Sequence, residues 1–312
     1  MTTDEAVDRA TDPATEVALD VPSGSPARLG TPQPGDPRLA RLSLNQKTVD
    51  GWNLREAVDG CVAAGLPAIG TWREPVAEVG VETAARWIRD AGLRVSSVCR
   101  GGFFTGAGDL SQSERHDDNR RALDEAATLG APCLVLVPGG LPAGDRDLRA
   151  ARDRAAAAVE ALVPHALEVG VRLAIEPMHP IFAADRGVVS TLAQALDMAE
   201  PLPAEAVGVV VDTFHVWWEP GVEEQIARAG DRIASYQVCE WITPLPPDAL
   251  LSRGMMGDGH IDFAHLTSLV TAAGYTGDVE VEIFNADVWA APGRDVVETL
   301  ARRYVELVEP HL

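Results

Sequence analysis

Three acidic residues in the second half of the chain come directly after apolar runs of strand length. Glu176 ends the run R-L-A-I-E, Asp212 follows three valines, and Glu282 lies in the run V-E-V-E-I. A carboxylate in such surroundings is costly unless it is paired or bound to a metal ion. Oxygen ligands of this kind suit Mn²⁺ or Mg²⁺ better than Zn²⁺. The three residues therefore predict a divalent-cation site, with Mn²⁺ preferred and Mg²⁺ or Co²⁺ as alternatives.

Further polar side chains accompany these carboxylates. Alternation along the run I-A-S-Y-Q-V-C places Gln237 on the inward face of a strand, where it would be a fourth ligand. His179 and His215 each follow a predicted strand by a few residues, which makes them candidates for proton transfer. Glu280 shares the inward face of Glu282 at a deeper level, and we expect it to pair with an interior arginine such as Arg172.

The elements that would position these residues form a regular alternation. Apolar runs of strand length cover residues 41–45, 68–71, 95–99, 133–137, 172–176, 207–212, 233–239 and 279–283. Alanine-rich amphipathic stretches, several followed by glycine, predict helices over 53–64, 81–91, 115–129, 147–169, 191–199, 222–229, 263–273 and 295–308. Eight strand–helix units in about 270 residues predict an α/β fold of the (β/α)₈ TIM-barrel type, whose catalytic residues lie at the carboxyl ends of the strands.

A doubly wound sheet is the alternative, but it would carry a G-x-G-x-x-G turn after the first strand. Residues 46–51, Q-K-T-V-D-G, contain no such turn. Residues 1–38 are rich in Pro, Gly, Ser, Thr and Asp and predict a disordered tail, which leaves residues 39–312 for the catalytic barrel.

Composition excludes several functions. The 312 residues include 47 acidic and 26 basic side chains, for a formal net charge of −21, which disfavours binding to nucleic acid or to anionic membranes. The four cysteines contain no C-x-x-C pair, so no zinc knuckle is expected. The acidic opening M-T-T-D-E-A-V-D lacks an apolar segment, and we expect a cytoplasmic protein with no membrane span.

The motifs together resemble the xylose-isomerase-like superfamily, often labelled sugar phosphate isomerase/epimerase, over residues 40–310. The resemblance rests on Glu176, D-x-x-H at 212–215, G-D-G-H-I-D at 257–262 and E-I-F at 282–284. It implies a metal-dependent isomerase or epimerase that acts on a small sugar or keto-sugar through an enediolate. Glu176, Asp212 and Glu282 would bind the metal, and the two glutamates would also act as acid and base. His215 would contact a substrate oxygen, and Arg253 would bind the substrate.

One departure from the family keeps a second reaction open. Most members have a histidine where this chain has Gln237. Similar barrels include the α subunits of C-glycoside deglycosidases and keto-inositol dehydratases, which are lyases acting on 3-keto-sugars or 3-keto-glycosides. Such a lyase is the alternative function, and it implies a small partner subunit beside the homo-oligomer otherwise expected. A non-catalytic binding barrel and an endonuclease for apurinic sites remain as further classes, the latter disfavoured by net charge and by having only seven histidines.

Aromatic and basic residues are expected at the rim of the barrel. Trp72 ends the second strand and Trp217 follows His215, and both would stack on a sugar or, alternatively, pack against another subunit. Arg73 and Arg100 would bind an anionic substrate or pair with surface carboxylates such as Glu74.

Overall fold

Eight parallel strands form a closed barrel in the computed structural model, which describes residues 32–312. Around the barrel the strands follow the order β1-β10-β7-β6-β5-β4-β3-β2, and pairing of β1 with β10 closes it. The barrel strands are β1 (Leu42–Asn45), β2 (Ala68–Trp72), β3 (Arg94–Gly102), β4 (Cys133–Val137), β5 (Arg172–Ile175), β6 (Val207–Asp212), β7 (Ile233–Val238) and β10 (Val279–Val281). The predicted (β/α)₈ barrel is confirmed.

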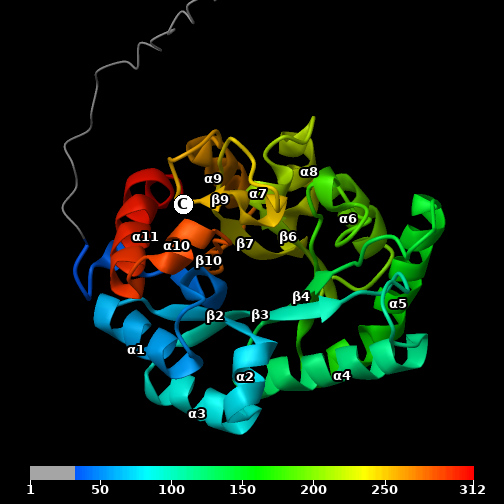
Figure 1. Cartoon of the computed structure of the whole chain (residues 1–312), viewed down its shortest axis with the longest axis horizontal. Helices are drawn as coiled ribbons and strands as arrows, with labels where there is room; N and C mark the ends of the chain where they lie inside the picture. The colour runs from blue at the N-terminus through cyan, green and yellow to red at the C-terminus, as the bar shows by residue number, and fades with distance from the viewer. Residues whose placement is uncertain (1–31) are drawn as a thin grey trace, which may run out of the picture.

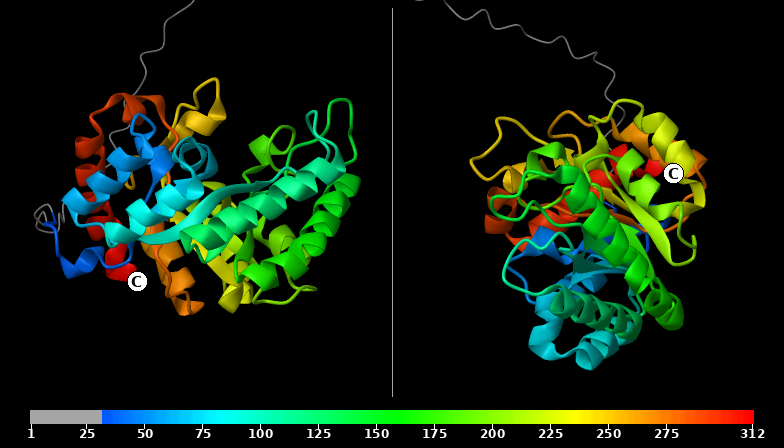
Figure 2. Two further views of the ribbon diagram at one scale, coloured as in Figure 1. Left: turned by 90° about the horizontal axis from the view of Figure 1, so that it is seen from below. Right: turned by 90° about the vertical axis from the view of Figure 1, so that its right-hand side faces the viewer.

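Helices lie outside the ring of strands, as Figures 1 and 2 show from three directions. They are α1 (Leu54–Ala64), α2 (Arg73–Val79), α3 (Val81–Asp90), α4 (Gln112–Leu129), α5 (Leu148–Val169), α6 (Leu192–Ala199), α7 (Thr213–Val216), α8 (Val222–Ala229), α9 (Phe263–Ala272), α10 (Ala286–Ala290) and α11 (Gly293–Leu307). A two-stranded antiparallel ribbon, β8 (Glu240–Trp241) with β9 (Arg253–Gly254), lies in the connection between β7 and α9.

Local sequence explains where the helices begin and end. Asn53 and Ser111 accept hydrogen bonds from the third residue of α1 and α4, and a glutamate at that third position bonds back, which forms a capping box in each case. Gly130 ends α4 in the left-handed conformation, with φ of 74°, which a side chain would disfavour. All eight predicted helices are present. The helices α2, α7 and α10 were not predicted because they are single short segments of 7, 4 and 5 residues.

Strand alternation divides the core into two apolar clusters. Val209 and Val211 of β6 face the large cluster between strands and helices, and Val210 faces a smaller cluster inside the barrel. The inner cluster also contains Cys99, Cys133, Val135, Ala174, Trp72 and Phe284. Each fully buried aliphatic side chain contributes about 1.5–3 kcal/mol. The outer cluster therefore dominates stability, and the barrel interior has room for polar groups.

The boundary of the predicted tail is wrong within the described residues. Residues 32–38 belong to the folded part, because Asp36 caps a 3₁₀ turn at Pro37–Leu39 and Leu39 is buried. Pro34 packs so closely on Gly65 that a Cβ at Gly65 would lie 2.5 Å from its Cα. Proline and glycine here form a fixed turn. Composition alone predicted disorder, because the same residue types are common in disordered segments. Residues 1–31 lie outside the described residues.

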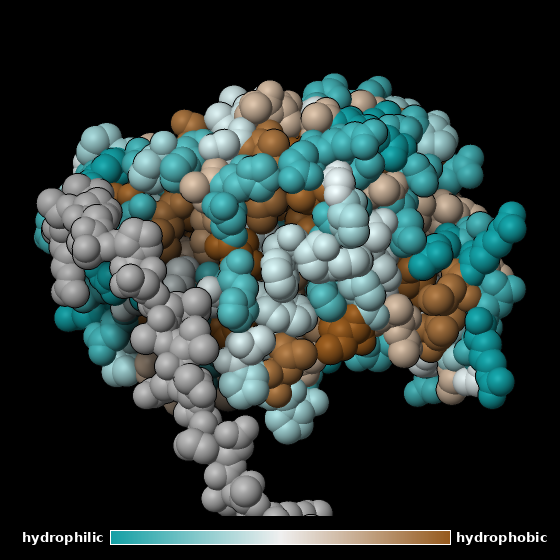
Figure 3. All heavy atoms as spheres, turned by 90° about the horizontal axis from the view of Figure 1, so that it is seen from above, coloured by the Kyte–Doolittle hydropathy of each residue, from teal (hydrophilic) through white to brown (hydrophobic). Residues whose placement is uncertain are grey.

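Figure 3 shows one face on which hydrophilic residues predominate, with smaller groups of hydrophobic residues among them. Within residues 32–312, none of the helices combines the length and the apolar character needed to cross a membrane.

Candidate metal centre

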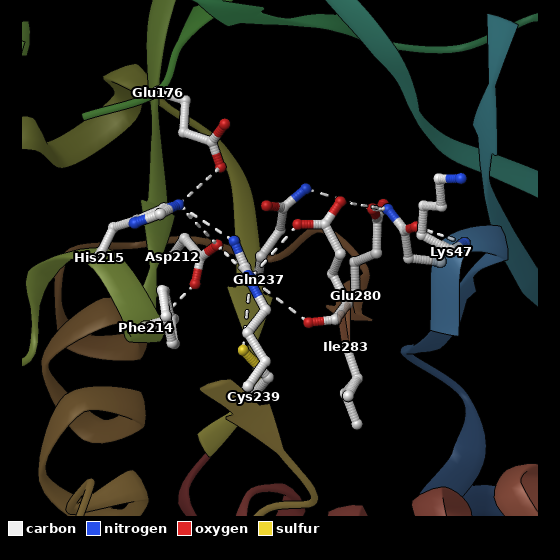
Figure 4. A network of polar contacts seen from close by, with 12 residues as sticks. Lys47, Glu176, Asp212, Phe214, His215, Gln237, Cys239, Glu280 and Ile283 are labelled. Atoms are coloured by element: carbon white, nitrogen blue, oxygen red, sulfur yellow. Dashed lines mark hydrogen bonds and ion pairs between the residues drawn. The ribbon is translucent and has the colours of Figure 1, made fainter. Parts of the chain in front are cut away.

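Four polar side chains come from four barrel strands that neighbour one another in the order β5, β6, β7 and β10. Glu176 directly follows β5, Asp212 ends β6, Gln237 lies near the end of β7, and Glu282 directly follows β10. All four are buried, with exposed fractions between 0% and 5%. Figure 4 shows Glu176, Asp212 and Gln237 facing a common space in the barrel. The structure therefore brings together the four residues that the sequence assigned to a metal site.

Glu280 holds the amide of Gln237 in one orientation. Its Oε1 accepts from Gln237 Nε2 at 3.2 Å, and its Oε2 accepts from the hydroxyls of Ser96 and Ser97 at 2.5 and 2.8 Å. Because the amide nitrogen is used in this way, Gln237 Oε1 is turned elsewhere, and it is a buried acceptor without a hydrogen-bond partner among the described residues. Such an acceptor is costly to bury unless a cation or a ligand donor meets it.

The expected partner of Glu280 was wrong. Arg172 lies at the start of β5, where its Nη1 donates to the backbone carbonyl of Asp231. The partner that sequence reasoning missed is Asn45 at the end of β1, whose Nδ2 donates to Glu280 Oε1 at 2.6 Å and to Glu282 Oε1 at 2.9 Å. A polar residue that ends a strand is the signal that could have found it, as it did for Asp212.

Arg253 brings a positive charge into the carboxylate cluster. Its Nη1 lies 2.8 Å from Asp212 Oδ2 and 3.3 Å from Glu282 Oε2, and its exposed fraction is 2%. The guanidinium also lies over the rings of Phe214 and Phe284, at 4.6 and 5.5 Å from their centroids. The sequence assigned Arg253 to the substrate. The structure pairs it instead with two of the predicted metal ligands, at a position that still borders the cavity.

His215 is buried beside the carboxylates. Its Nε2 lies 3.9 Å from both Glu176 Oε1 and Asp212 Oδ2, and its Nδ1 accepts the backbone N–H of His179 at 3.0 Å. Arg253 Nη2 lies 3.0 Å from Nε2. A neutral imidazole has only one acceptor nitrogen, so it cannot accept from both donors. The His215 tautomer therefore decides which of the two contacts is a hydrogen bond.

His179 lies farther from the carboxylates than the sequence suggested. Its ring packs against Trp241 and Trp218, with centroids at 4.5 and 5.3 Å, and its Nδ1 accepts the backbone N–H of Ile181. It is not among the residues that line the cavity at the carboxylates. Burial lowers the pKa of His179 to about 4. The structure gives His179 a positioning contact with His215 through its backbone.

Burial and mutual repulsion set the protonation of the carboxylates. The pKa of Glu176 lies well above its usual value, because burial and then the charges of Glu282 and Asp212 oppose ionisation. Burial raises the pKa of Glu282 to about 8, although Arg253 acts in the opposite direction. Burial also raises the pKa of Asp212, again partly offset by Arg253. Without a bound cation, burial therefore favours the protonated forms of these carboxyl groups.

The donor set fits a hard divalent cation. Ligand atoms of Glu176, Asp212 and His215 lie within 4.8 Å of one another, and the amide oxygen of Gln237 adds an unpaired acceptor. Most of these atoms are carboxylate and amide oxygens, beside the imidazole of His215. Such oxygens suit Mg²⁺ or Mn²⁺. A cation bound here would share the carboxylates of Asp212 and Glu282 with Arg253.

A cavity of about 260 Å³ opens at the carboxylates. Glu176, Glu282 and Arg253 line it together with Trp72 and Arg100. Trp72 is fixed by a hydrogen bond from its Nε1 to Asn45 Oδ1 and by an edge contact with Phe284. These two predicted substrate contacts, Trp72 and Arg100, therefore reach the cavity.

Two other predicted rim residues do not reach the cavity. Trp217 caps the short helix α7, and its ring packs against Trp241 with centroids 5.8 Å apart. Arg73 pairs with Asp118 and Glu125 at 3.0 and 2.6 Å, in agreement with the expected alternative of pairing with carboxylates, although Glu74 is not one of the partners.

Glu240 holds the stretch at 257–262 in place through hydrogen bonds to its backbone. Its carboxylate is buried and accepts the backbone N–H groups of Gly257, His260 and Ile261 at 2.8–3.0 Å. A Cβ at Gly259 would lie 2.1 Å from the carbonyl oxygen of Trp241, so that position requires glycine. This loop follows Arg253, and Glu240 therefore fixes the chain segment beside that residue.

Comparisons with known proteins agree with this architecture. The protein SMc04130 from Sinorhizobium meliloti, a solved structure, is 47% identical, with a TM-score of 0.83 over 86% of this chain and 99% of that one. An L-ribulose 3-epimerase from Mesorhizobium japonicum is 28% identical over 224 residues, which cover 68% of this chain and 69% of the relative. An inosose isomerase from Halalkalibacterium halodurans is 24% identical over 213 residues, 67% of this chain and 73% of the relative.

A solved IolI protein with a bound zinc atom has a TM-score of 0.76 at 20% identity, over 87% of this chain and 99% of that one, which shows a shared fold. The profile of one family, the xylose isomerase-like TIM barrels, matches residues 58–304, which is most of the barrel. This chain is a member of the xylose isomerase-like TIM barrel family.

Proposed function

We propose that this protein is a divalent-metal-dependent isomerase or epimerase of a small sugar or keto-sugar, which moves a proton next to a carbonyl through an enediolate. The observation that carries the proposal is the pair Glu176 and Glu282. Both are buried carboxylates with raised pKa values, and they come from β5 and β10, which two other strands separate around the barrel. A substrate between them would meet a proton-transfer group on each side. The names of the two relatives, an L-ribulose 3-epimerase and an inosose isomerase, support the same reaction class.

Each residue of the site would have its own role in the reaction. Glu282, in its ionised form, would take the proton from the carbon next to the carbonyl, and the electron pair would move to the carbonyl oxygen. Glu176, in its acid form, would return a proton to that carbon from the other side, which inverts it. Alternatively it would protonate the former carbonyl carbon while the proton of the adjacent hydroxyl passes to the former carbonyl oxygen, which exchanges the carbonyl position. His215 and Arg253, whose Nε2 and Nη2 atoms lie 3.0 Å apart, would contact a substrate oxygen.

Glu176, Asp212, Gln237 and Glu282 would hold the divalent cation. When bound, it supplies a positive charge that polarises the carbonyl and lowers the pKa values of the carboxylates around it. Glu280 and Asn45 do not need to touch the substrate. They hold Gln237 and Glu282 in position through the hydrogen bonds already described.

The size of the cavity favours a small substrate. Its volume of about 260 Å³ lies below the ~300–1,000 Å³ typical of pockets for drug-sized ligands. A single small sugar suits this space better than a glycoside with an aromatic aglycone. The cavity therefore favours isomerisation or epimerisation over the glycoside cleavage that the sequence left open.

Deuterium exchange tests the proposal. The Mn²⁺-loaded protein is incubated in D₂O with four- to six-carbon ketoses and keto-inositols, and NMR follows the carbon next to the carbonyl. We expect deuterium at that carbon together with a new epimer or isomer, and loss of exchange by at least a hundredfold in Glu176→Gln and Glu282→Gln. Glu219→Gln is the control, because Glu219 is a buried carboxylate that caps α6 away from the cavity. Release of water or an aglycone without an epimer would show a lyase instead, and full exchange in both variants would refute the assigned roles.

A further inference from the structure

The cavity at the carboxylates is polarised. The two buried acidic residues that border it, Glu176 and Glu282, come from the ends of β5 and β10, and the exposed Glu74 borders it from α2. Arg100 comes from β3 and Arg186 from the connection between β5 and α6. Lys47 also borders the cavity, but its Nζ pairs with Asp50 at 2.6 Å. Away from the carboxylate cluster that holds Arg253, the spare positive charge at the cavity therefore resides on Arg100 and Arg186.

Arg100 is a cation without a counter-ion. It forms no ion pair within 4 Å and no hydrogen bond with any residue in 32–312, and its Nε is buried without a partner. Its guanidinium lies over the rings of Phe103 and Trp72, at 4.5 and 5.6 Å from their centroids, which fixes its direction.

Arg186 is nearly as free. Its Nε is buried without a hydrogen bond and lies 3.5 Å from Asp185 Oδ2, and the Asp185 side chain is 61% exposed. Its backbone is fixed, because its carbonyl accepts the N–H of Gly139 at 2.9 Å. Burial lowers the pKa of Arg100; the exposed carboxylate of Glu74 acts against this, and the charge of Arg186 acts with it. Both guanidinium groups border the same cavity, so an anion bound there would offset two positive charges.

We propose that the substrate carries an anionic group, a carboxylate or a phosphate, which Arg100 and Arg186 bind while the carbonyl end lies at the carboxylate cluster. This inference rests on the proposed function, since it names the substrate class of the same cavity. Planar guanidinium groups match both anions with paired hydrogen bonds. Trp72, over which Arg100 lies, would form the wall between the two ends of the substrate.

Three probes with one carbon skeleton test the anionic group: D-fructose, D-fructose 6-phosphate and D-fructuronate. Binding to the Mn²⁺-loaded protein is measured by calorimetry, which does not require turnover. We expect at least one anion to bind at least tenfold more tightly than D-fructose, with an affinity that falls as salt is added. The tighter of the two anions identifies carboxylate or phosphate as the group.

A bound cation also attracts anions, so variants are needed to show that the preference for an anionic probe comes from Arg100 and Arg186. Arg100→Gln and Arg186→Gln should each reduce the preference at least fivefold while the affinity for D-fructose stays within twofold. Arg73→Gln is the control, since Arg73 is already paired with Asp118 and Glu125. The proposal is overturned if the three probes bind equally, if neither anion binds, or if the preference survives in both variants.

Deuterium exchange separates this proposal from the proposed function. Anion preference without exchange on any probe would refute the reaction and leave the anion subsite standing. Exchange on D-fructose without anion preference would refute the anion subsite and leave the proposed reaction standing.

Discussion

Replacement of Arg253 by methionine removes the positive charge that the carboxylate cluster contains and keeps much of the apolar stem. Arg253 Nη1 lies 2.8 Å from Asp212 and 3.3 Å from Glu282, and all three side chains are buried. Two unit charges about 4 Å apart attract each other by about 4 kcal/mol at an effective dielectric of about 20. Removing one partner of a buried pair typically costs about 3–5 kcal/mol, and we expect a loss in that range for Arg253→Met at pH 8.5 without metal.

Two conditions should reduce that loss. At pH 5.5 the carboxylates are protonated more readily, because the free energy of protonation becomes more favourable by about 1.4 kcal/mol for each proton and each pH unit. Saturating Mn²⁺ should also reduce the loss, because the cation replaces the missing positive charge among the same oxygens. Arg253→Met should therefore be rescued by acid and by Mn²⁺, and its thermal midpoint should rise more on addition of Mn²⁺ than that of the unmodified protein.

Differential scanning fluorimetry and urea unfolding, in EDTA or in Mn²⁺ at both pH values, measure these effects. A loss of 3 kcal/mol corresponds to a fall of about 6 °C or more in the thermal midpoint. Arg73→Met is the matched control, because it removes an arginine with two carboxylate partners nearer the surface, and its effect should not depend on Mn²⁺. Equal losses for Arg253→Met under all four conditions would refute the electrostatic account of the cluster.

Two more predictions concern the same cluster. In EDTA, the free energy of unfolding should fall as pH rises from about 5 to 8.5, because the pKa of Glu282 is raised to about 8 in the folded protein and its carboxyl group loses the stabilising proton over this range. Urea unfolding should show a weaker fall in Glu282→Gln. An equal fall in that variant would contradict the raised pKa of Glu282. Gly70→Ala should lower the free energy of unfolding by about 1–3 kcal/mol and weaken Mn²⁺ binding, because the new Cβ would lie 2.5 Å from the Glu280 carboxyl group. Unchanged Mn²⁺ affinity would show that Glu280 does not hold the metal ligands in position.

Much of the fold was predictable because periodicity is a local property. The run that ends at Asp212 was predicted as 207–212 and is β6 (Val207–Asp212). The site was predictable for a related reason. Parallel strands of a barrel bring their carboxyl ends to one face, so polar residues that end strands must lie near one another.

Contacts between distant segments were not predictable. Asn45 and Glu280 are 235 positions apart, and their hydrogen bond depends on the closure of the barrel through β1 and β10. The pairing of Arg253 with Asp212 depends on the ribbon β8–β9, which is too short for a periodic signal. Arg186 lies in a loop whose path is set by backbone contacts with Gly139, which no pattern of side chains records.

Mn²⁺ binding tests the central claim most directly. The protein is freed of metal with EDTA, and Mn²⁺ is titrated while electron paramagnetic resonance follows the free ion and calorimetry follows the heat. We predict one ion per chain, with affinity reduced at least tenfold in Asp212→Asn and Gln237→Leu and unchanged in Glu219→Gln. No stoichiometric binding, or equal affinity in all four proteins, would contradict a metal centre formed by Glu176, Asp212, Gln237 and Glu282.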